Sequence, residues 1–174
     1  MPNCPTPCPN CPRKYRVLDP GCGSRMMYTD RSHPSVVFGD NRQEIAVLPD
    51  KSSSGGMRLL MVNPDVLMDF RLMPYRDNTF SLVVFDPPHV NNSGTRSWLT
   101  IKYGKLGVDW RDDLRAGFSE CFRVLHPSGT LIFKWNETKI KTSEVLALTP
   151  NVPLFWQRSG QKLRTHWIVF LKDI

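Results

Sequence analysis

The sequence predicts an α/β domain, because short apolar stretches that end in an acidic residue recur along the chain. Arg16-Val17-Leu18-Asp19, Val36-Val37-Phe38-Gly39-Asp40 and Leu82-Val83-Val84-Phe85-Asp86 are three of them. Each has the length and composition of a buried strand. With 174 residues, the chain is long enough to bury one hydrophobic core. We expect a proline- and cysteine-rich arm at residues 1–14 and a single domain at 15–174.

The expected elements are mostly strands, with two helices in the second half. Strands are predicted at residues 15–19, 36–39, 58–62 or 65–68, 81–86, 130–135, 152–156 and 166–171. Apolar residues recur at helical spacing over residues 110–125, and Pro127 follows the end of this helix. A second, short helix is expected at 141–148. Only about a dozen residues separate Gly23 from the second strand, so the helices between strands must be trimmed.

The segment Asp19-Pro20-Gly21-Cys22-Gly23-Ser24 follows the first strand and predicts a binding loop. Glycines after a strand let the backbone approach a ligand closely. Asp40 ends the second strand about 20 residues later, a spacing that places a carboxylate over a ribose hydroxyl in nucleotide-binding α/β folds. Asp69 follows the apolar stretch Val66-Leu67-Met68, and we expect it near an adenine amino group.

Asp86-Pro87-Pro88-His89 follows a buried strand and is the most informative motif. The Asp86 carboxylate and the Pro87 carbonyl can both accept hydrogen bonds from an amino group, which leaves the nitrogen lone pair free to attack a methyl sulfonium. The two prolines stiffen the turn, because their φ is fixed. His89 can stack on a base pulled from its duplex. An ordinary strand-to-loop turn that ends in Pro-Pro is the alternative.

Together these motifs resemble those of class I S-adenosylmethionine-dependent methyltransferases, specifically the enzymes that methylate amino nitrogens of nucleic acid bases. Asp19–Ser24 resembles their Asp-Pro-x-x-Gly-Ser cofactor loop. Asp86–His89 resembles their (Asp/Asn/Ser)-Pro-Pro-(Tyr/Phe/Trp) catalytic motif, with histidine in place of the usual aromatic residue. Residues 120–133 are similar to the family's helix, turn and fifth strand, and the resemblance covers about residues 15–172.

The resemblance implies a compact Rossmann-like methyltransferase sheet, mostly parallel with an antiparallel last strand and with trimmed helices. It also implies S-adenosylmethionine as the cofactor. The implied cofactor-binding residues are Asp19, Pro20, Gly21, Cys22, Gly23, Asp40 and Asp69, and the implied catalytic residues are Asp86, Pro87, Pro88 and His89. The implied reaction is methyl transfer to an exocyclic amino group of a nucleic acid base, with adenine N6 favoured over cytosine N4 and guanine N2.

No separate target-recognition domain is evident, so loops, a partner subunit or a second copy must select the substrate. The segment from Val90 to Asp109 interleaves basic and aromatic residues, which suits backbone contact and base stacking. The expected substrate-binding residues are Arg96, Trp98, Lys102 and Tyr103 of this segment, with Lys134 and Asn136 at the end of the fifth strand. Structural roles are equally open for Trp98 and Tyr103 as anchors and for Lys134 and Asn136 as strand-end caps.

Charge favours a polyanionic partner, either DNA or RNA. The chain has 23 Lys and Arg against 16 Asp and Glu, a net charge of +7. No apolar stretch approaches the ~20 residues of a membrane span, so we expect no membrane contact and a cytoplasmic protein. Two alternative functions stay open: a methyltransferase of a protein amide or small molecule, and a non-catalytic binding subunit.

Cysteines cluster at the start of the chain. Cys4, Cys8 and Cys11 include the spacing of a zinc knuckle, but a clear fourth ligand is missing. His33 and Cys22 are the only nearby candidates for that ligand, so we favour a reduced, proline-rich arm and leave a zinc site at these cysteines as the alternative.

Overall fold

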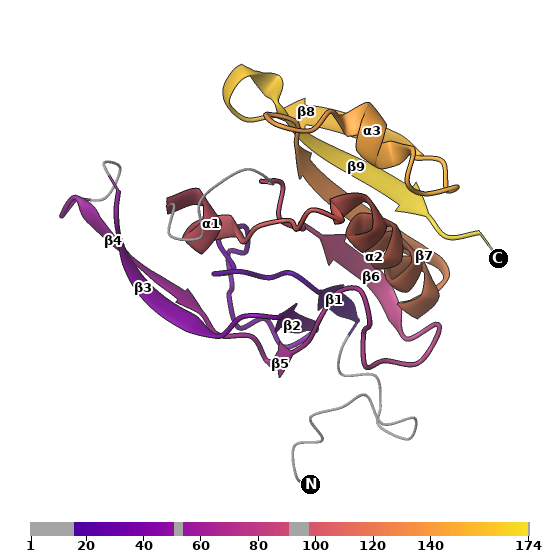
Figure 1. The fold of residues 1–174 in the computed structure, drawn as a ribbon. Coiled ribbons are helices and arrows are strands. Elements are labelled where there is room, and N and C mark those ends of the chain that lie inside the picture. Colours follow the sequence, from indigo (N-terminus) through magenta and orange to yellow (C-terminus); the bar gives the residue numbers. More distant parts are fainter. Residues whose placement is uncertain (1–15, 51–53, 91–97, 174) are drawn as a thin grey trace, which may run out of the picture.

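The fold is built on one seven-stranded sheet in the computed structural model, which describes residues 16–50, 54–90 and 98–173. Across the sheet (Figure 1) the strands are β5 (Val66–Leu67), β2 (Val36–Asp40), β1 (Val17–Asp19), β6 (Phe80–Phe85), β7 (Leu125–Asn136), β9 (Thr165–Leu171) and β8 (Phe155–Ser159). Neighbours from β5 to β7 run parallel, whereas β9 is antiparallel to both β7 and β8. The predicted mostly parallel sheet with an antiparallel last strand is confirmed.

Parallel pairing brings the predicted acidic residues to one edge of the sheet. In the register of β1, Val17 pairs with Val36 of β2 and with Leu82 of β6. Asp19, Asp40 and Asp86 therefore lie near one another where these three strands end. The strand order also reverses here, because β1 leads outward to β2 whereas β6 lies on its other side. Ligands of open α/β sheets bind at such a point.

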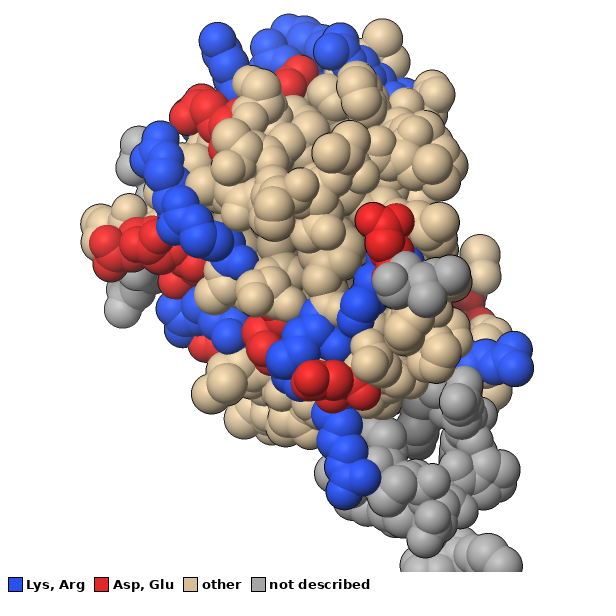
Figure 2. All heavy atoms as spheres, turned by 90° about the vertical axis from the view of Figure 1, so that its right-hand side faces the viewer, with Lys and Arg blue, Asp and Glu red and all other residues tan. Residues whose placement is uncertain are grey.

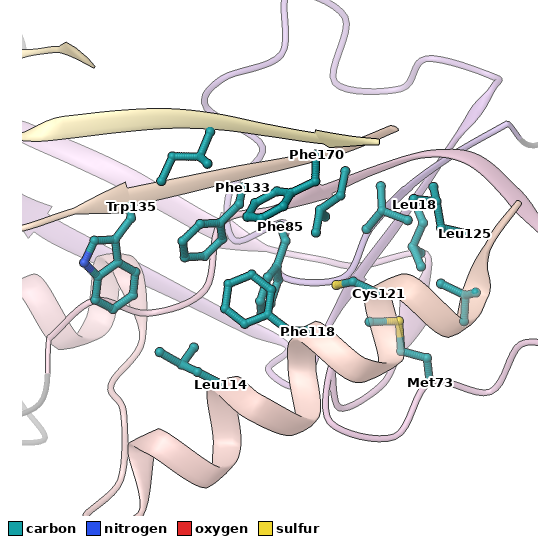
Figure 3. Close-up of a cluster of buried hydrophobic side chains, with 14 of the residues drawn as sticks. Leu18, Met73, Phe85, Leu114, Phe118, Cys121, Leu125, Phe133, Trp135 and Phe170 are labelled. Atoms are coloured by element: carbon teal, nitrogen blue, oxygen red, sulfur yellow. The ribbon is translucent and has the colours of Figure 1, made fainter. Parts of the chain in front are cut away.

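One helix, α2 (Trp110–Val124), covers one face of the sheet and confirms the helix predicted at 110–125. Figure 3 shows its side chains directed at those of the sheet. The Phe118 ring lies 5.8 Å from the Phe85 ring and 4.8 Å from the Phe133 ring. A Cβ at Gly117 would lie 2.8 Å from the Phe85 ring, so this residue lets the helix approach β6 closely. This packing fixes the strand that ends at Asp86.

The segment after β2 differs from the sequence prediction. In place of a brief crossover, β3 (Glu44–Pro49) and β4 (Met57–Val62) form an antiparallel hairpin outside the main sheet. The predicted strand at 58–62 thus belongs to the hairpin, and the alternative at 65–68 corresponds to β5 of the main sheet. The hairpin extends away from the sheet in Figure 1.

The helical content is low, as predicted. No helix lies between β1 and β2, where residues 20–35 form turns, and α3 (Thr142–Leu146) is a single short helix. An additional helix, α1 (Trp98–Tyr103), lies in the segment expected to be a loop, and Ile101 of α1 packs against the hairpin. Within the described ranges, no helix has the length and apolar character needed to cross a membrane.

Candidate active site

The loop after β1 is held by two acidic side chains. The backbone N–H of Gly21 donates to Asp19 Oδ1 at 3.2 Å, and the N–H of Gly23 donates to Asp40 Oδ2 at 2.9 Å. Gly23 has φ +50°, a left-handed conformation that glycine adopts without strain. A Cβ at Gly21 would lie 3.5 Å from the carbonyl oxygen of Asp86, so the loop backbone passes beside the end of β6.

Asp19 lies behind this loop and is fully buried. Burial raises the pKa of the Asp19 carboxyl to about 7, and the nearby charges of Asp86 and Asp40 act in the same direction. The hydrogen bond from Gly21 and the interaction with Tyr28 oppose this rise. Asp19 thus shapes the loop from within the protein, rather than from the cavity in front of it.

An acid-lined cavity of about 310 Å³ opens in front of the loop. It is lined, among others, by Pro20, Gly21, Asp40, Asp69, Phe70 and Asp86. The structure therefore brings the acids at the ends of β2 and β6 and the acid after β5 into one cavity. We call this the first cavity.

Asp40 and Asp69 of the first cavity each pair with the arginine that follows two residues later in the sequence. Arg42 Nε lies 3.1 Å from Asp40 Oδ1, and Arg42 also donates to the Ile101 carbonyl of α1 at 3.1 Å. Arg71 lies 2.6 Å from Asp69 Oδ2, and hydrogen bonding from Arg71 lowers the pKa of Asp69. The sequence analysis missed both arginines, although the repeated Asp-x-Arg after a strand is visible in the sequence.

A second cavity, of about 300 Å³, lies on the other side of Asp86. Its lining includes Asp86, His89, Tyr103, Lys134, Asn136 and Lys139. Asp86 and Tyr103 line both this cavity and the first one. A smaller cavity of about 60 Å³ lies between the glycine loop and the turn at Pro87, and Cys22, Gly23 and Lys102 line it.

The Asp86 side chain forms an ion pair with Lys134 at the end of β7. Lys134 Nζ donates to Asp86 Oδ2 and lies 5.5 Å from the centre of the Trp167 ring. The two side chains are 19% and 24% exposed, so the pair is reached from the cavities. Because Oδ2 is held by Lys134, the second carboxylate oxygen of Asp86 is the one left for a ligand.

His89 lies among aromatic rings. Its ring centre is 5.3 Å from that of Tyr103 and 6.3 Å from that of Trp135. Burial lowers the pKa of His89 and Lys134 adds to this effect, whereas Asp86 opposes it. The lowered pKa favours a neutral imidazole, which suits a flat stacking surface.

The turn after α1 closes on the Pro-Pro segment. Gly104 has φ +76°, and a Cβ there would lie 2.9 Å from Pro88 Cγ. Both the left-handed backbone and the close contact with Pro88 require glycine at this position. The turn places Tyr103 beside His89. The unpredicted helix α1 thus forms one wall of the site.

Asn136 lines the second cavity with its amide group already engaged. Its Nδ2 donates to Thr165 Oγ1 at 3.2 Å, and its Oδ1 accepts from the Thr138 N–H at 3.1 Å. This arrangement agrees with the capping role left open for Asn136.

Several predicted residues cannot be placed. Arg96, the Trp98 side chain, and Cys4, Cys8 and Cys11 lie outside the described residues. Among the side chains that the structure describes, no three His, Cys, Asp or Glu residues are grouped as metal ligands.

Comparison with known proteins supports the fold. No protein-family model matches the chain, and no curated protein sequence matches it. Among solved structures, the PH0226 protein of Pyrococcus horikoshii OT3 is similar with a TM-score of 0.55 and 15% identity, over 91% of this chain and 82% of that one. A TehB-like SAM-dependent methyltransferase of Corynebacterium glutamicum is similar with a TM-score of 0.51 and 16% identity, over 94% and 83%.

A SAM-dependent methyltransferase of Leishmania major is also similar, with a TM-score of 0.51 and 15% identity, over 94% of this chain and 67% of that one. At these sequence identities the similarity shows the fold alone, and the chemistry is argued from the residues of the site. The chain therefore has the Rossmann-like fold of S-adenosylmethionine-dependent methyltransferases.

Proposed function

We propose that this chain is an S-adenosylmethionine-dependent methyltransferase that acts on an exocyclic amino group of a nucleic acid base, with adenine N6 favoured. The observation that carries the proposal is the position of Asp86 in the lining of two cavities of about 310 and 300 Å³. A cofactor in the first cavity and a base in the second would meet at this carboxylate. Such proximity is the main requirement for methyl transfer.

The residues of the first cavity fit the cofactor. Asp40 would face the ribose hydroxyls, Asp69 the adenine amino group, and the half-buried ring of Phe70 would provide an apolar wall. When bound, S-adenosylmethionine supplies a methyl group on a positively charged sulfur. The Asp40 carboxylate beside the Gly21 backbone favours such a cation electrostatically.

The residues around the second cavity would orient the amino group. The Asp86 oxygen not held by Lys134 and the Pro87 carbonyl would accept its two N–H bonds, so that the lone pair faces the first cavity. The amino nitrogen then gains the methyl group and loses one proton. The Asp86 oxygen that accepted this N–H is placed to receive the proton.

The second cavity is better suited to a nucleotide than to a small neutral molecule. His89 and Tyr103 provide flat rings for a base, and Lys139 lines the same cavity with a cation. The net charge of +7 acts in the same direction. The competing functions are methyl transfer to a protein amide, methyl transfer to a small molecule, and binding without catalysis.

A transfer assay distinguishes these functions. The full chain is incubated with tritiated-methyl cofactor and separate pools of DNA, RNA and protein, followed by mass spectrometry of the nucleosides. We expect label in a nucleic acid pool and N6-methylated adenine in its digest. Label confined to the protein pool would support the amide substrate, and cofactor binding without any transfer would support the binding subunit.

A further inference from the structure

We propose that a third hollow, beside the second cavity, binds a nucleotide that flanks the target base in single-stranded nucleic acid. The hollow measures about 640 Å³ and lies between α3 and the paired strands β8 and β9. Its lining includes Lys141, Trp156, Arg158, Arg164 and His166, none of which belongs to the catalytic or cofactor site described above. The inference rests on the proposed function, because it extends the same substrate.

The cations of this hollow differ from the arginines around the first cavity. Lys141, Arg158 and Arg164 are exposed, and within residues 16–50, 54–90 and 98–173 none of them forms an ion pair. By contrast, Arg42 and Arg71 each pair with two acidic residues. Cations that are not held in an ion pair are available to phosphate groups.

The acidic residue of the hollow is already engaged. Glu137 Oε1 lies 3.1 Å from His166 Nε2, and Glu137 Oε2 accepts from Thr142 Oγ1 at 3.0 Å. Glu144, on α3, pairs with Arg111 at 3.3 Å. The positive charge of the hollow is therefore not cancelled from within. In Figure 2, Lys and Arg side chains gather at the top of the molecule, the end where Figure 1 shows the β8–β9 turn.

Trp156 provides the stacking surface. It is 56% exposed, an unusual degree for a residue that could be buried on the sheet. Trp156 and Arg158 are two residues apart on β8, so their side chains leave the same face of the sheet. Proteins that bind single-stranded nucleic acid combine an exposed aromatic ring, on which a base stacks, with a nearby cation that contacts a phosphate. Trp156 and Arg158 provide this combination.

The hollow continues from the second cavity, since Thr138 lines both. The strand register gives the lateral separation of the two sites across the sheet. Lys134, the partner of Asp86, pairs with Trp167 of β9, which in turn pairs with Gln157 of β8. From the end of β6 to β8 there are three strand spacings, about 14 Å. Lys134, Trp167 and Gln157 leave one face of the sheet and Trp156 and Arg158 leave the other. A single strand with its target base at Asp86 would therefore pass the edge of the sheet at Thr138, which lines both sites, to place a flanking nucleotide over Trp156.

Binding measurements with ligands of two lengths test the inference. Anisotropy is recorded for a labelled adenine-containing dinucleotide and for single-stranded DNA and RNA of about 12 nucleotides, within the site sizes of such proteins. We expect Trp156→Ala to weaken binding of the long strand by about tenfold and binding of the dinucleotide by less than about twofold, since only the long strand reaches β8. Trp156→Phe should restore most of the loss, and Arg158→Ala should reduce the salt slope by about one unit.

Phe155→Ala is the matched control, because Phe155 is 57% exposed on the same strand but faces the opposite side of the sheet. A strand that carries 5-iodouracil near the target adenine should crosslink to the peptide that contains Trp156. Equal affinity of Trp156→Ala and the unaltered chain for the long strand would overturn the inference. So would Trp156-dependent binding of poly-glutamate without binding of nucleic acid, which would indicate an acidic protein partner.

The two proposals can fail separately. Methyl transfer with no effect of Trp156→Ala on long-strand binding would retain the proposed function and overturn the flanking site. Trp156-dependent strand binding without methyl transfer would retain the flanking site and overturn the proposed enzyme activity.

Discussion

The two cavities that meet at Asp86 differ in their charge. The first is lined by four carboxylates, Asp40, Asp69, Asp86 and Asp113, against the three cations Arg42, Arg71 and Lys105, and both arginines are bound to these acids. The second has the lysines Lys134 and Lys139, and Asp86 pairs with only the first of these. This division suits a cationic cofactor on one side and a polyanionic substrate on the other.

The division follows from the residues that end neighbouring strands. β2 ends in Asp40 and β6 is followed by Asp86, whereas β7 has Lys134 near its end. Because parallel strands end at one edge, each strand contributes one charge to a row across that edge. The Asp86–Lys134 pair marks where the sign of this row changes.

The largest expected effect concerns Asp19, behind the first cavity. Its pKa in the folded protein is about 7 against a usual value of 3.8. Between these pH values the folded state keeps a proton that the unfolded chain loses, so this residue lowers stability as pH rises from about 4 to about 7. Above that range the loss in the free energy of unfolding is constant, and its upper bound is about 4 kcal/mol.

Asp19→Asn cannot ionise and should remove this loss. Urea unfolding at pH 5 and pH 8 should therefore show a larger gain in the free energy of unfolding at pH 8 than at pH 5. Asp112→Asn is the control, because the Asp112 side chain is 78% exposed. Parallel pH profiles for Asp19→Asn and the unaltered chain would contradict the burial-based explanation.

Removal of the Asp86 carboxylate tests the boundary between the cavities. Asp86→Ala should lower kcat by at least ~10²-fold, because a group that acts mainly in the transition state affects turnover more than binding. Cofactor affinity by calorimetry should remain nearly unchanged. Asp112→Ala should leave both quantities as they are. A fully active Asp86→Ala enzyme would show that Asp86–Pro88 is merely a structural turn.

Removal of Asp40 tests the first cavity alone. Asp40→Ala should weaken cofactor binding by about 1–3 kcal/mol, the usual value for a charge-assisted hydrogen bond. Strand binding measured by anisotropy should change by less than about twofold, because Asp40 does not line the second cavity. Unchanged cofactor affinity in calorimetry would mean that the end of β2 does not bind the ribose.

Much of this site could be predicted from the sequence, because its residues directly follow buried strands. The acids at positions 19, 40 and 86 end or follow short apolar stretches with the length and composition of buried strands, and parallel pairing then brings them together. The helix over 110–124 was predictable from its apolar spacing, since one face packs on the sheet. These features depend on local sequence and on one topological rule.

The β3–β4 hairpin was not predicted because its sequence lacks the usual alternation. Ile45, Val47, Leu59 and Met61 are apolar but exposed, so both faces of the hairpin contain hydrophobic residues. The third hollow was not predictable either, because it depends on the register that sets Arg158 opposite His166. Antiparallel register depends on distant pairing, and a shift by one residue would direct Trp156 to the other face.

The smallest expected effect concerns His89 in the second cavity. His89→Ala should weaken strand binding by about 1 kcal/mol, the lower end of values for base stacking, because Tyr103 remains beside it. Cofactor affinity should not change, which makes this variant the counterpart of Asp40→Ala.

His89→Phe separates stacking from proton transfer. Phenylalanine keeps a flat ring but cannot accept a proton, so most activity should remain if stacking is the role of His89. Burial lowers the pKa of this residue and favours the neutral ring, which agrees with a stacking role. The check is kcat and KM for Ala and Phe variants side by side. If phenylalanine lowered kcat as much as alanine, His89 would be a proton acceptor, and the second cavity would take part in the chemistry as well as in binding.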